Sequence, residues 1–450
     1  MCERMPASAV SGMADGPGLS ARVELPAPDP GLPWTPYRKA ASVTSPDDPI
    51  PATAPSTARS SDRPLKILIG CDTFAPDING AARFAERLAA GLVQRGHDVH
   101  VSAPNQAYRR AQPRTEVIEG EPMTLHRLPS VRWAPHDWLR FVWPWRSKHY
   151  ARKVLDRVQP DVVHIQSHII IGRGLARIAH ERGIPVVATN HVMPENILDH
   201  SIFPDVVDRN IVKFAWADAR RTLSTVRAVT TPTRRAADFL ERTIDIKGVI
   251  PVSCGIDRSH YSPVLGQREK NRVIFVGRLT AEKQIDVILR AIAELDPALE
   301  VTFDIVGGGD QRKNLEHLTA ELGLSERVTF HGRISDEELR ALYSRASVFA
   351  IASIAELQSI ATMEAMASAL PIVAADAVAL PHLVHDGENG YLFQPGDVAE
   401  LSARLRDVLT AEPAEYERMQ QASLDGVVIH DINRTLDTFE ALYRDEPLPA

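Results

Sequence analysis

The sequence predicts an α/β protein made of two Rossmann-like domains in tandem. At 450 residues the chain is too long for one ordinary core, and chains of this length divide into two or three folding units. Short apolar segments alternate with helical patterns in two successive series. Strands that alternate with helices are joined by right-handed crossovers and form parallel sheets with both faces covered.

The first series begins with a buried-strand pattern at residues 66–70. Phe84, Leu88 and Leu92 then stand at helical spacing and Gly96 is a typical stop, which predicts a helix over 81–96. Further strand patterns follow at 97–101, 161–165, 185–189 and 228–231. We therefore assign residues 64–245 to a first domain.

The second series predicts a domain over residues 246–412. Its strand patterns stand at 249–252, 272–277, 302–307, 328–330, 347–351 and 371–374. Helices over 413–450 are expected to finish the fold. Because open α/β sheets bind ligands beyond the carboxyl ends of their strands, a cleft between the two sheets is the expected site.

Residues 1–63 are dense in proline, alanine and serine and show no apolar periodicity. Segments of this composition cannot bury enough apolar surface to offset the entropy of ordering. We expect a disordered tail.

The composition excludes several classes of protein. A formal net charge of -7 argues against a general nucleic-acid binder, which is normally basic. No apolar run approaches the roughly 18 residues of a membrane span. Cys2, Cys71 and Cys254 form no C-x-x-C pair, so neither a disulfide framework nor a zinc cluster is predicted. The start lacks a secretion-signal pattern, and a cytoplasmic protein is expected.

Two carboxylates mark the most informative segment of the sequence. Glu356 follows the predicted strand at 347–351, and Glu364 stands eight positions later on the next predicted helix. The first free amides of that helix, near Ser359 and Ile360, suit a phosphate group. The carboxylates suit hydroxyl donors such as a sugar or a ribose. Acidic residues also cap helices, so a purely structural role is the alternative.

Two cations follow the predicted strand at 272–277. Arg278 stands at the strand end and Lys283 in the next turn, where both reach the same edge of the sheet. Positive groups placed where charge develops can stabilise a leaving diphosphate. The alternative is a pair of ordinary surface charges.

These motifs in this order resemble the retaining glycosyltransferases of family four. The resemblance covers about residues 64–410 and implies the GT-B fold, with two Rossmann-like domains facing a central cleft. It implies that the first domain, 64–245, binds the acceptor and that the second, 246–412, binds the donor. It is carried by a G-R-L-x-x-x-K turn at 277–283, a G-G-G-D loop at 307–310, the E-x7-E box at 356–364 followed by A-M-A, and N-G-Y-L-F at 389–393.

The resemblance implies a UDP- or GDP-sugar as co-substrate and no cofactor. The cleft motifs contain no carboxylate pair spaced like a D-x-D metal box, so no metal is expected. The resemblance also implies that Arg278 and Lys283 bind the donor diphosphate, that Glu356 contacts sugar hydroxyls and that Glu364 contacts the ribose. His191, in a T-x-H segment, is expected beside the reacting sugar. The implied catalytic residues are Glu356, His191, Arg278 and Lys283. The donor-binding residues are Gly80, Gly277, Arg278, Lys283, Gly307, Gly308, Arg333, Glu356, Ser359, Ile360 and Glu364.

Some residues depart from the family pattern or favour a structural role. Gln358 and Ser359 stand where the family often has Phe-Gly, and Gly80 stands alone where two glycines are usual. A dinucleotide site at 307–309 would need a glycine at position 312, which is arginine. For His164 and His168, beside the neighbouring strand, the structural role is favoured.

An aromatic and basic segment runs from 132 to 150. Tryptophan interleaved with arginine and lysine suits an anionic membrane interface. Packing of the aromatics into the first core is an equally weighted alternative. The residues proposed for membrane or acceptor contact are Trp138, Arg140, Trp143, Trp145, Arg146 and Lys148.

The sequence therefore predicts transfer of a hexose, glucose or mannose, from a nucleotide diphosphate sugar to a hydroxyl, with retention and an α-linkage. A lipid headgroup and a small polyol are the candidate acceptors, and no nucleic acid is expected as a partner. A lipid acceptor would place the protein at the inner face of the membrane. The alternatives are a nucleotide-sugar epimerase or hydrolase on the same scaffold, since fold does not set chemistry, and a non-catalytic nucleotide-sugar binding protein.

Overall fold

The structure is a computed structural model that describes residues 63–77, 79–109, 111–132, 140–191, 205–268 and 271–449, with side chains of the helix at 205–223 described from residue 212. The expected disordered tail at 1–63 therefore lies, apart from Arg63, outside the described residues. Trp138 lies outside them as well.

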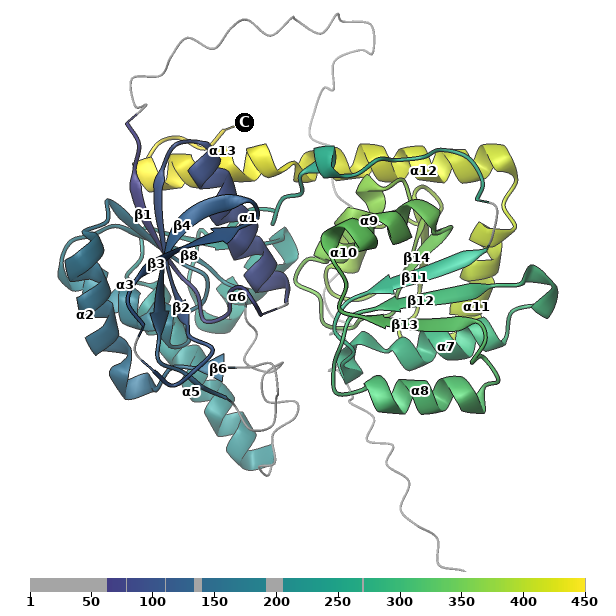
Figure 1. Ribbon diagram of the computed structural model, residues 1–450, viewed down its shortest axis with the longest axis horizontal. Helices are drawn as coiled ribbons and strands as arrows, with labels where there is room; N and C mark the ends of the chain where they lie inside the picture. The colour runs from purple at the N-terminus through teal and green to yellow at the C-terminus, as the bar shows by residue number, and fades with distance from the viewer. Residues whose placement is uncertain are drawn as a thin grey trace, which may run out of the picture. The chain divides into compact units, whose positions relative to one another are not determined.

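The first half of the chain is built on an eight-stranded sheet in the order β10-β9-β8-β7-β1-β2-β4-β3 (Figure 1). Its strands pair in parallel except β3, which is antiparallel to β4. The strands are β1 (Lys66–Gly70), β2 (Asp98–Pro104), β3 (Arg114–Ile118), β4 (Glu121–Leu128), β7 (Val162–Ile165), β8 (Val186–Thr189), β9 (Ala228–Thr231) and β10 (Ile250–Pro251).

Helices and short elements complete this half. Its helices are α1 (Gly80–Gln94), α2 (Ser147–Val158), α3 (Ile171–Glu181), α5 (Asp205–Leu223) and α6 (Arg234–Ile244). The aromatic segment contributes β5 (Val131–Arg132), β6 (Arg140–Phe141) and the single turn η1 (Pro144–Arg146).

Strand β10 corrects the predicted domain boundary. Residues 249–252 were assigned to the second domain, but Ile250 pairs with Thr230 of β9 and extends the first sheet. Gly248, with φ of 78°, allows the chain to turn after α6, and Val249 packs in the same buried cluster as Ile244 of α6. The first sheet therefore continues beyond residue 245.

The hairpin of β3 and β4 was not anticipated from the sequence. Glu119 and Gly120 join the two strands, and both have positive φ, 49° and 82°. A two-residue turn with this geometry matches the twist of paired strands. The hairpin adds an antiparallel edge to an otherwise parallel sheet.

The second half contains a six-stranded parallel sheet in the order β13-β12-β11-β14-β15-β16. The strands are β11 (Arg272–Val276), β12 (Thr302–Val306), β13 (Val328–Gly332), β14 (Val348–Ile351), β15 (Ile372–Ala375) and β16 (Gly390–Phe393). Its helices are α7 (Ile285–Ala293), α8 (Arg312–Glu321), α9 (Asp336–Arg345), α10 (Ile360–Ala367), α11 (Val398–Leu409) and α12 (Pro413–Val427).

The order of this sheet reverses between β11 and β14. The chain moves outward through β11, β12 and β13, and then returns to the other side of β11 with β14. The connections that leave β11 and β14 therefore run to opposite faces of the sheet. The crevice left at the carboxyl ends of two such strands is where open α/β sheets bind ligands.

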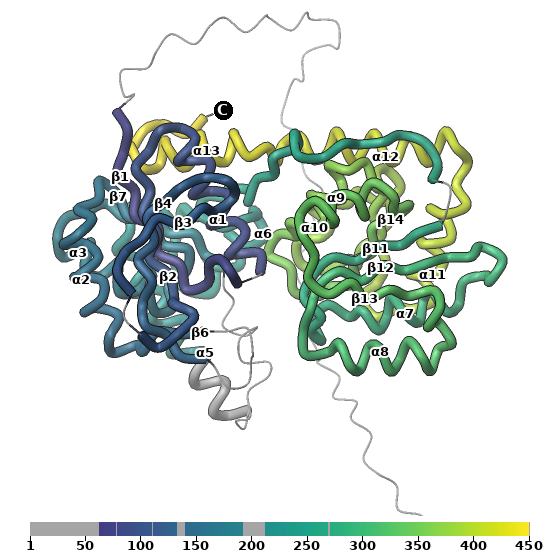
Figure 2. The backbone as a smooth tube through the Cα atoms, in the orientation of Figure 1, coloured from purple at the N-terminus to yellow at the C-terminus, as the bar shows by residue number. Residues whose placement is uncertain are grey.

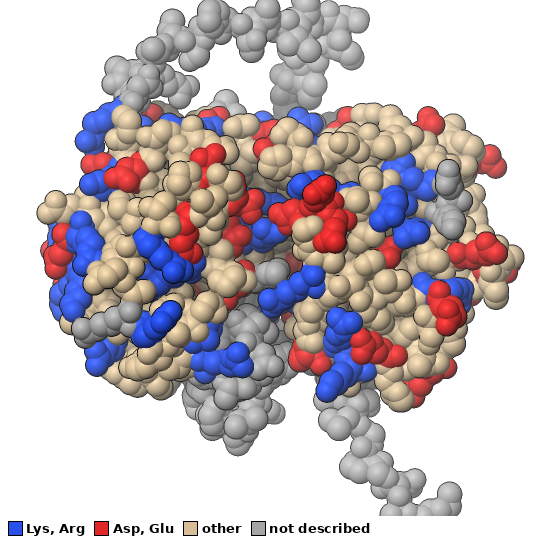
Figure 3. Space-filling view, in the orientation of Figure 1, with Lys and Arg blue, Asp and Glu red and all other residues tan. Residues whose placement is uncertain are grey.

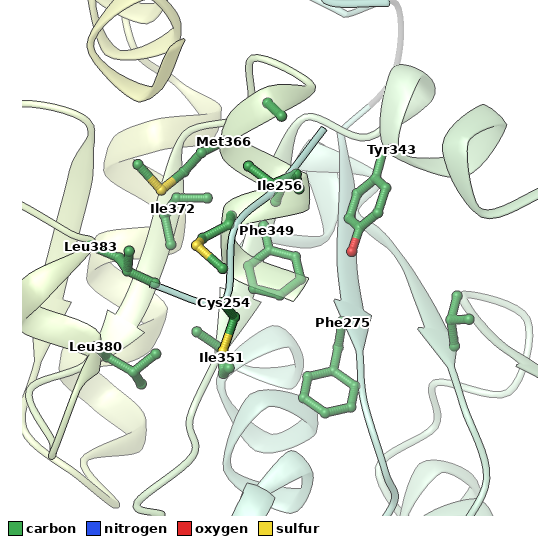
Figure 4. Packing of buried hydrophobic residues seen from close by; sticks show 14 of the residues in the cluster. Cys254, Ile256, Phe275, Tyr343, Phe349, Ile351, Met366, Ile372, Leu380 and Leu383 are labelled. Atoms are coloured by element: carbon green, nitrogen blue, oxygen red, sulfur yellow. The ribbon is translucent and has the colours of Figure 1, made fainter. Parts of the chain in front are cut away.

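A buried core positions helix α10 against this crevice. Figure 4 shows Phe349 and Ile351 of β14 near Met366 of α10 and Ile372 of β15, and all four are at most 2% exposed. Cys254, from the segment that joins the two sheets, lies in the same cluster. The helix that carries Glu364 is therefore fixed by apolar packing.

The last helix returns to the first half of the chain, as the backbone path in Figure 2 shows. Helix α13 (Ile432–Arg444) lies within residues 413–450, for which helices were expected, and packs against the first sheet. Phe439 is 0% exposed, and its ring lies 4.8 Å from that of His164 and 5.9 Å from that of Phe84. Arg95 and His97 both bind Glu440.

Charges of both signs are interspersed over the face drawn in Figure 3. Within the described ranges, no helix is long and apolar enough to cross a membrane.

Candidate donor site at the carboxyl ends of β11 and β14

The crevice brings two of the predicted site residues into direct contact. Lys283 comes from the turn after β11 and Glu356 from the loop after β14. Lys283 Nζ lies 2.5 Å from Glu356 Oε1, and each side chain is 13% exposed. A backbone hydrogen bond from Ile354 N to Glu282 O, at 3.0 Å, ties the two loops together. The strand reversal thus joins residues that are 73 positions apart.

Arg278 follows β11, as Lys283 does, and so lies on the same side of the crevice as Lys283. Its Nη2 lies 3.9 Å from Glu282, and its side chain is 32% exposed. Burial acts to raise the pKa of Glu282, but a hydrogen bond from Thr280 and the charges of Lys283 and Arg278 outweigh it and lower that pKa. Glu282 is therefore ionised and anchors the turn that carries both cations.

Glycines allow the loops after β11, β12 and β13 to pack closely. Gly277 N donates to Val306 O at 3.0 Å, and Gly307 N donates to Gly332 O at 2.8 Å. Gly307 has φ of 132°, and a Cβ there would lie 1.8 Å from Gly277 O. A Cβ at Gly308 would meet nothing within 4 Å. Arg333 follows β13 directly and is exposed.

Helix α10 begins at the crevice as expected. Ser359 is its N-cap and accepts a hydrogen bond from Thr362 N at 3.3 Å. Ile360 is the first helical residue. The first backbone amides of a helix have no partner within it, so they can hold a phosphate.

Glu364 lies on α10 in an enclosed position and is held by residues that the sequence analysis did not identify. Arg87 Nη2, from α1, lies 2.6 Å from Glu364 Oε1, and Tyr343 Oη donates to Oε2 at 3.3 Å. The Glu364 side chain is 9% exposed and that of Arg87 16%. A sequence signal for Arg87 existed: Arg83 and Arg87 stand one turn apart on the helix after Gly80.

Gly80 begins helix α1, which follows β1, and His191 follows the carboxyl end of β8. Asn79 caps α1 by accepting from Ala82 N at 2.9 Å, and a Cβ at Gly80 would meet nothing within 4 Å. His191 Nε2 is enclosed and lacks a hydrogen-bond partner in the part of the chain that is described. Burial lowers the pKa of His191 to about 3, so its imidazole is neutral at physiological pH.

His164 has contacts of the structural kind expected for it. Its Nδ1 lies 2.6 Å from Tyr443 Oη and its Nε2 lies 2.8 Å from Thr189 Oγ1. Burial, with His191 nearby, lowers the pKa of His164 to about 3. His168 is also buried, and its ring stacks near that of Trp216.

A cavity of about 770 Å³ opens beyond strands β1 and β2. Arg109, Arg114, Arg127 and Glu116 contribute to its lining. Arg114 and Arg127 both donate to Glu116, which leaves the lining with an excess of positive charge.

The aromatic segment divides into buried and exposed parts. Trp145 is 73% exposed and stacks on Trp143 at a ring distance of 4.6 Å. Arg146 and Lys148 are exposed beside it. Arg140 is turned inward, with Nε 3.0 Å from Asn105 O and 2.9 Å from Ser130 Oγ.

Two family matches together span most of the described chain. Residues 78–260 match Glycosyltransferase Family 4, and residues 257–424 match Glycosyl transferases group 1. The chain belongs to glycosyltransferase family 4. The expected GT-B architecture and the expected retaining glycosyltransferase class are confirmed.

Curated relatives and a solved structure agree with membership of family 4. The chain is 29% identical over 372 residues to the MMP alpha-(1->4)-mannosyltransferase of Mycolicibacterium hassiacum, covering 76% of this chain and 88% of the relative. It is 24% identical over 392 residues to the alpha-monoglucosyldiacylglycerol synthase of Streptococcus pneumoniae, covering 83% and 85%. The sucrose-phosphate synthase of Thermosynechococcus elongatus superposes with a TM-score of 0.69 at 19% identity, over 84% of this chain and 98% of that one. This last likeness concerns the fold.

Replacing Gly307 by alanine is expected to destabilise this family 4 enzyme by about 3 kcal/mol or more, because the new Cβ meets backbone at a strained φ. Gly308→Ala is the matched control, with open space for its Cβ, and should change stability by less than about 1 kcal/mol. Urea unfolding of both variants measures the difference. Equal losses at the two positions would contradict the close packing of the loops.

The stability of the protein is expected to depend on the ionisation of Glu86, which lies on α1 beside Arg83. Burial is the main cause that raises the pKa of Glu86 from 4.5 to about 7, against the opposing charge of Arg83. The folded state therefore binds the proton more tightly than the unfolded state. The stabilising contribution of the neutral acid is complete below pH 4.5 and is lost as pH rises through about 7.

Glu86→Gln removes this titration, so the variant should gain stability relative to the parent as pH rises. The gain between about pH 5 and about pH 8 should reach at most about 3 kcal/mol. Urea unfolding at both pH values measures it. A stability difference that stays constant between them would show that Glu86 titrates normally.

Proposed function

We propose that this enzyme transfers a hexose, glucose or mannose, from a nucleotide diphosphate sugar to a hydroxyl acceptor and forms an α-glycosidic bond. The observation that carries the proposal is the contact of Lys283 with Glu356 at the start of α10, where the sheet order reverses. This crevice offers a cation and free helix amides, which suit a diphosphate, next to a carboxylate, which suits the hydroxyls of a sugar.

In this proposal Arg278 and Lys283 neutralise the diphosphate as it leaves. The charge on the diphosphate grows as the glycosidic bond breaks, so fixed cations stabilise the transition state more than the bound donor. The amides of Ser359 and Ile360 add the positive end of a helix to the same group. The pair of Lys283 and Glu356 holds the cation next to the carboxylate that would bind the sugar hydroxyls.

Gly80 and His191 would complete the site from the first half. The absence of a side chain at Gly80 leaves its surroundings open, so the donor can approach the backbone closely. A neutral His191 can donate or accept a hydrogen bond without adding charge. Gly277, Gly307, Gly308 and Arg333 would line the nucleotide side of the crevice, and Glu364 would bind the ribose.

The two curated relatives support the proposed sugar and one class of acceptor. One is named as a mannosyltransferase and the other as a synthase of a glucosylated diacylglycerol. The exposed Trp145 next to Arg146 and Lys148 suits an anionic lipid surface, since an indole ring can lie at headgroup depth. We therefore propose a lipid headgroup as the acceptor and peripheral contact with an anionic membrane, with Trp143 and Trp145 at the contact.

Nucleotide release tests the proposed reaction directly. The purified protein is incubated with UDP-glucose or GDP-mannose, with and without a lipid extract, and both the nucleotide and the glycolipid are measured. Release from one donor that depends on lipid supports the transferase. Conversion of the donor without any acceptor would instead indicate an epimerase or a hydrolase, and binding of donor without turnover would indicate a binding protein.

Glu356→Gln should lower kcat/KM by about 10- to 100-fold, which corresponds to about 1 to 3 kcal/mol of lost hydrogen bonding in the transition state. Glu316→Gln makes the same chemical change at a partly exposed surface pair on α8 and should leave kcat/KM unchanged. If Glu356→Gln retains full activity, its proposed contact with the sugar is wrong.

Trp145→Ala should weaken binding to vesicles of phosphatidylcholine and phosphatidylglycerol, since it removes an exposed indole next to two cations. Ile429→Ala removes another exposed apolar side chain, 58% exposed, and serves as the control. Co-sedimentation with the vesicles measures binding. Equal binding by the parent and Trp145→Ala would exclude the membrane role of this segment.

A further inference from the structure

Helix α1 carries two arginines that bind acidic residues of the second half. Arg83 forms an ion pair with Asp336 in the first turn of α9, and Arg87 forms one with Glu364 on α10. The two arginines stand one helical turn apart, so they lie on the same side of α1. The contact between Arg87 and Glu364 joins residues that are 277 positions apart in the sequence.

The surroundings of Glu364 fix the direction of its carboxylate. Arg87 binds Oε1, and Tyr343 Oη donates to Oε2. Tyr343 is 0% exposed, so the tyrosine cannot follow a movement of the carboxylate. Tyr261 also bonds this carboxylate. An ionised carboxylate has about four lone-pair sites, so these three partners leave room for a hydroxyl of a ligand.

Arg87 is enclosed and incompletely paired. Its Nη1 is buried and has no hydrogen-bond partner among the residues that the structure describes. Burial disfavours the charged guanidinium, but the charge of Glu364 outweighs this effect and raises the pKa of Arg87. Arg87 therefore stays charged beside Glu364 and keeps one unused donor in an enclosed position.

The segment between the two glutamates is also tied to the chain that links the sheets. Gln358 Oε1 accepts from Cys254 N at 2.7 Å, and Gln358 Nε2 donates to Ser253 Oγ at 3.2 Å. Thr233 Oγ1, at the start of α6, donates to Leu357 O at 3.2 Å. The residue that replaces the usual phenylalanine of the family thus connects the donor segment to the linker.

We propose that Arg87 is a positioning residue for the donor, which orients the Glu364 carboxylate toward the ribose and makes ribose recognition depend on helix α1. The inference rests on the proposed role of Glu364 as the ribose ligand. It assigns to the first half of the chain a part in donor recognition beyond the open backbone at Gly80. The hydrogen bonds of Gln358 with the linker, and of Thr233 with Leu357, hold the segment that precedes α10.

Nucleotide binding by Arg87 variants tests this role without requiring activity. The probes are UDP and GDP together with their 2′,3′-dideoxy counterparts, measured by isothermal titration calorimetry on the full chain. For the nucleotide that binds the parent, loss of the ribose hydroxyls should weaken binding by about 10-fold or more. Arg87→Ala should weaken binding of the ribose form to the same degree and leave binding of the dideoxy form unchanged.

Two further variants separate positioning from a general structural effect. Arg87→Lys retains the charge but not the planar geometry of the guanidinium, and should recover part of the preference for ribose. Arg83→Ala breaks the neighbouring ion pair with Asp336 without touching Glu364 and should keep the full preference. If Arg87→Ala does not fold, as judged by its unfolding transition, Arg87→Lys still decides the question.

The outcomes also distinguish this inference from the proposed function. A parent that binds ribose and dideoxy nucleotides equally, or binds neither UDP nor GDP, would refute the role of Glu364 and with it the inference. A parent that prefers ribose, together with Arg87 variants that retain the whole preference, would refute the inference alone. Equal loss of both nucleotide forms in Arg87→Lys would show that Arg87 acts only on the fold.

Discussion

The reversal of strand order between β11 and β14 is the constraint on which the candidate site depends. Connections that leave these neighbouring strands on opposite faces cannot fill the space between their carboxyl ends. Lys283 enters that space from one side and Glu356 from the other, and they meet at 2.5 Å. The start of α10 points to the same place because its core residues are locked between β14 and β15. The order of the strands thereby creates the crevice at which we propose that an anion and a sugar bind together.

Ion pairs are the second feature of the candidate site. Each carboxylate of the E-x7-E box has a cation of its own, Lys283 for Glu356 and Arg87 for Glu364. Enclosed ion pairs contribute little net stability, because desolvation offsets their attraction. In the proposed site, the ion pairs instead orient the two carboxylates toward the hydroxyls of the donor. His191 differs, since enclosure of its ring lowers its pKa to about 3 and so favours the neutral form.

Much of the fold followed from local patterns, and the exceptions have physical causes. The buried strands of both sheets are short apolar runs, which are recognisable because parallel strands are covered on both faces. The β3 and β4 hairpin was missed because polar residues interrupt the apolar ones along both strands, so neither strand forms an apolar run. Its turn, Glu119 and Gly120, is also not a typical Asn-Gly pair. β16 was recognised only as a motif, and β10 was placed in the wrong sheet because two residues carry no sign of their pairing partner.

The sequence by itself determined the α/β class, the two Rossmann-like domains and the family, and it proposed the two glutamates and two cations as site residues, because these features reside in short motifs and local periodicity. Tertiary structure alone decided which charges meet. Glu364 takes its cation, Arg87, from the first half, although it also accepts a hydrogen bond from Tyr343 of its own domain, and Gln358 binds the linker at Cys254. Such contacts join residues more than a hundred positions apart, and they depend on crossovers and packing that no local pattern encodes.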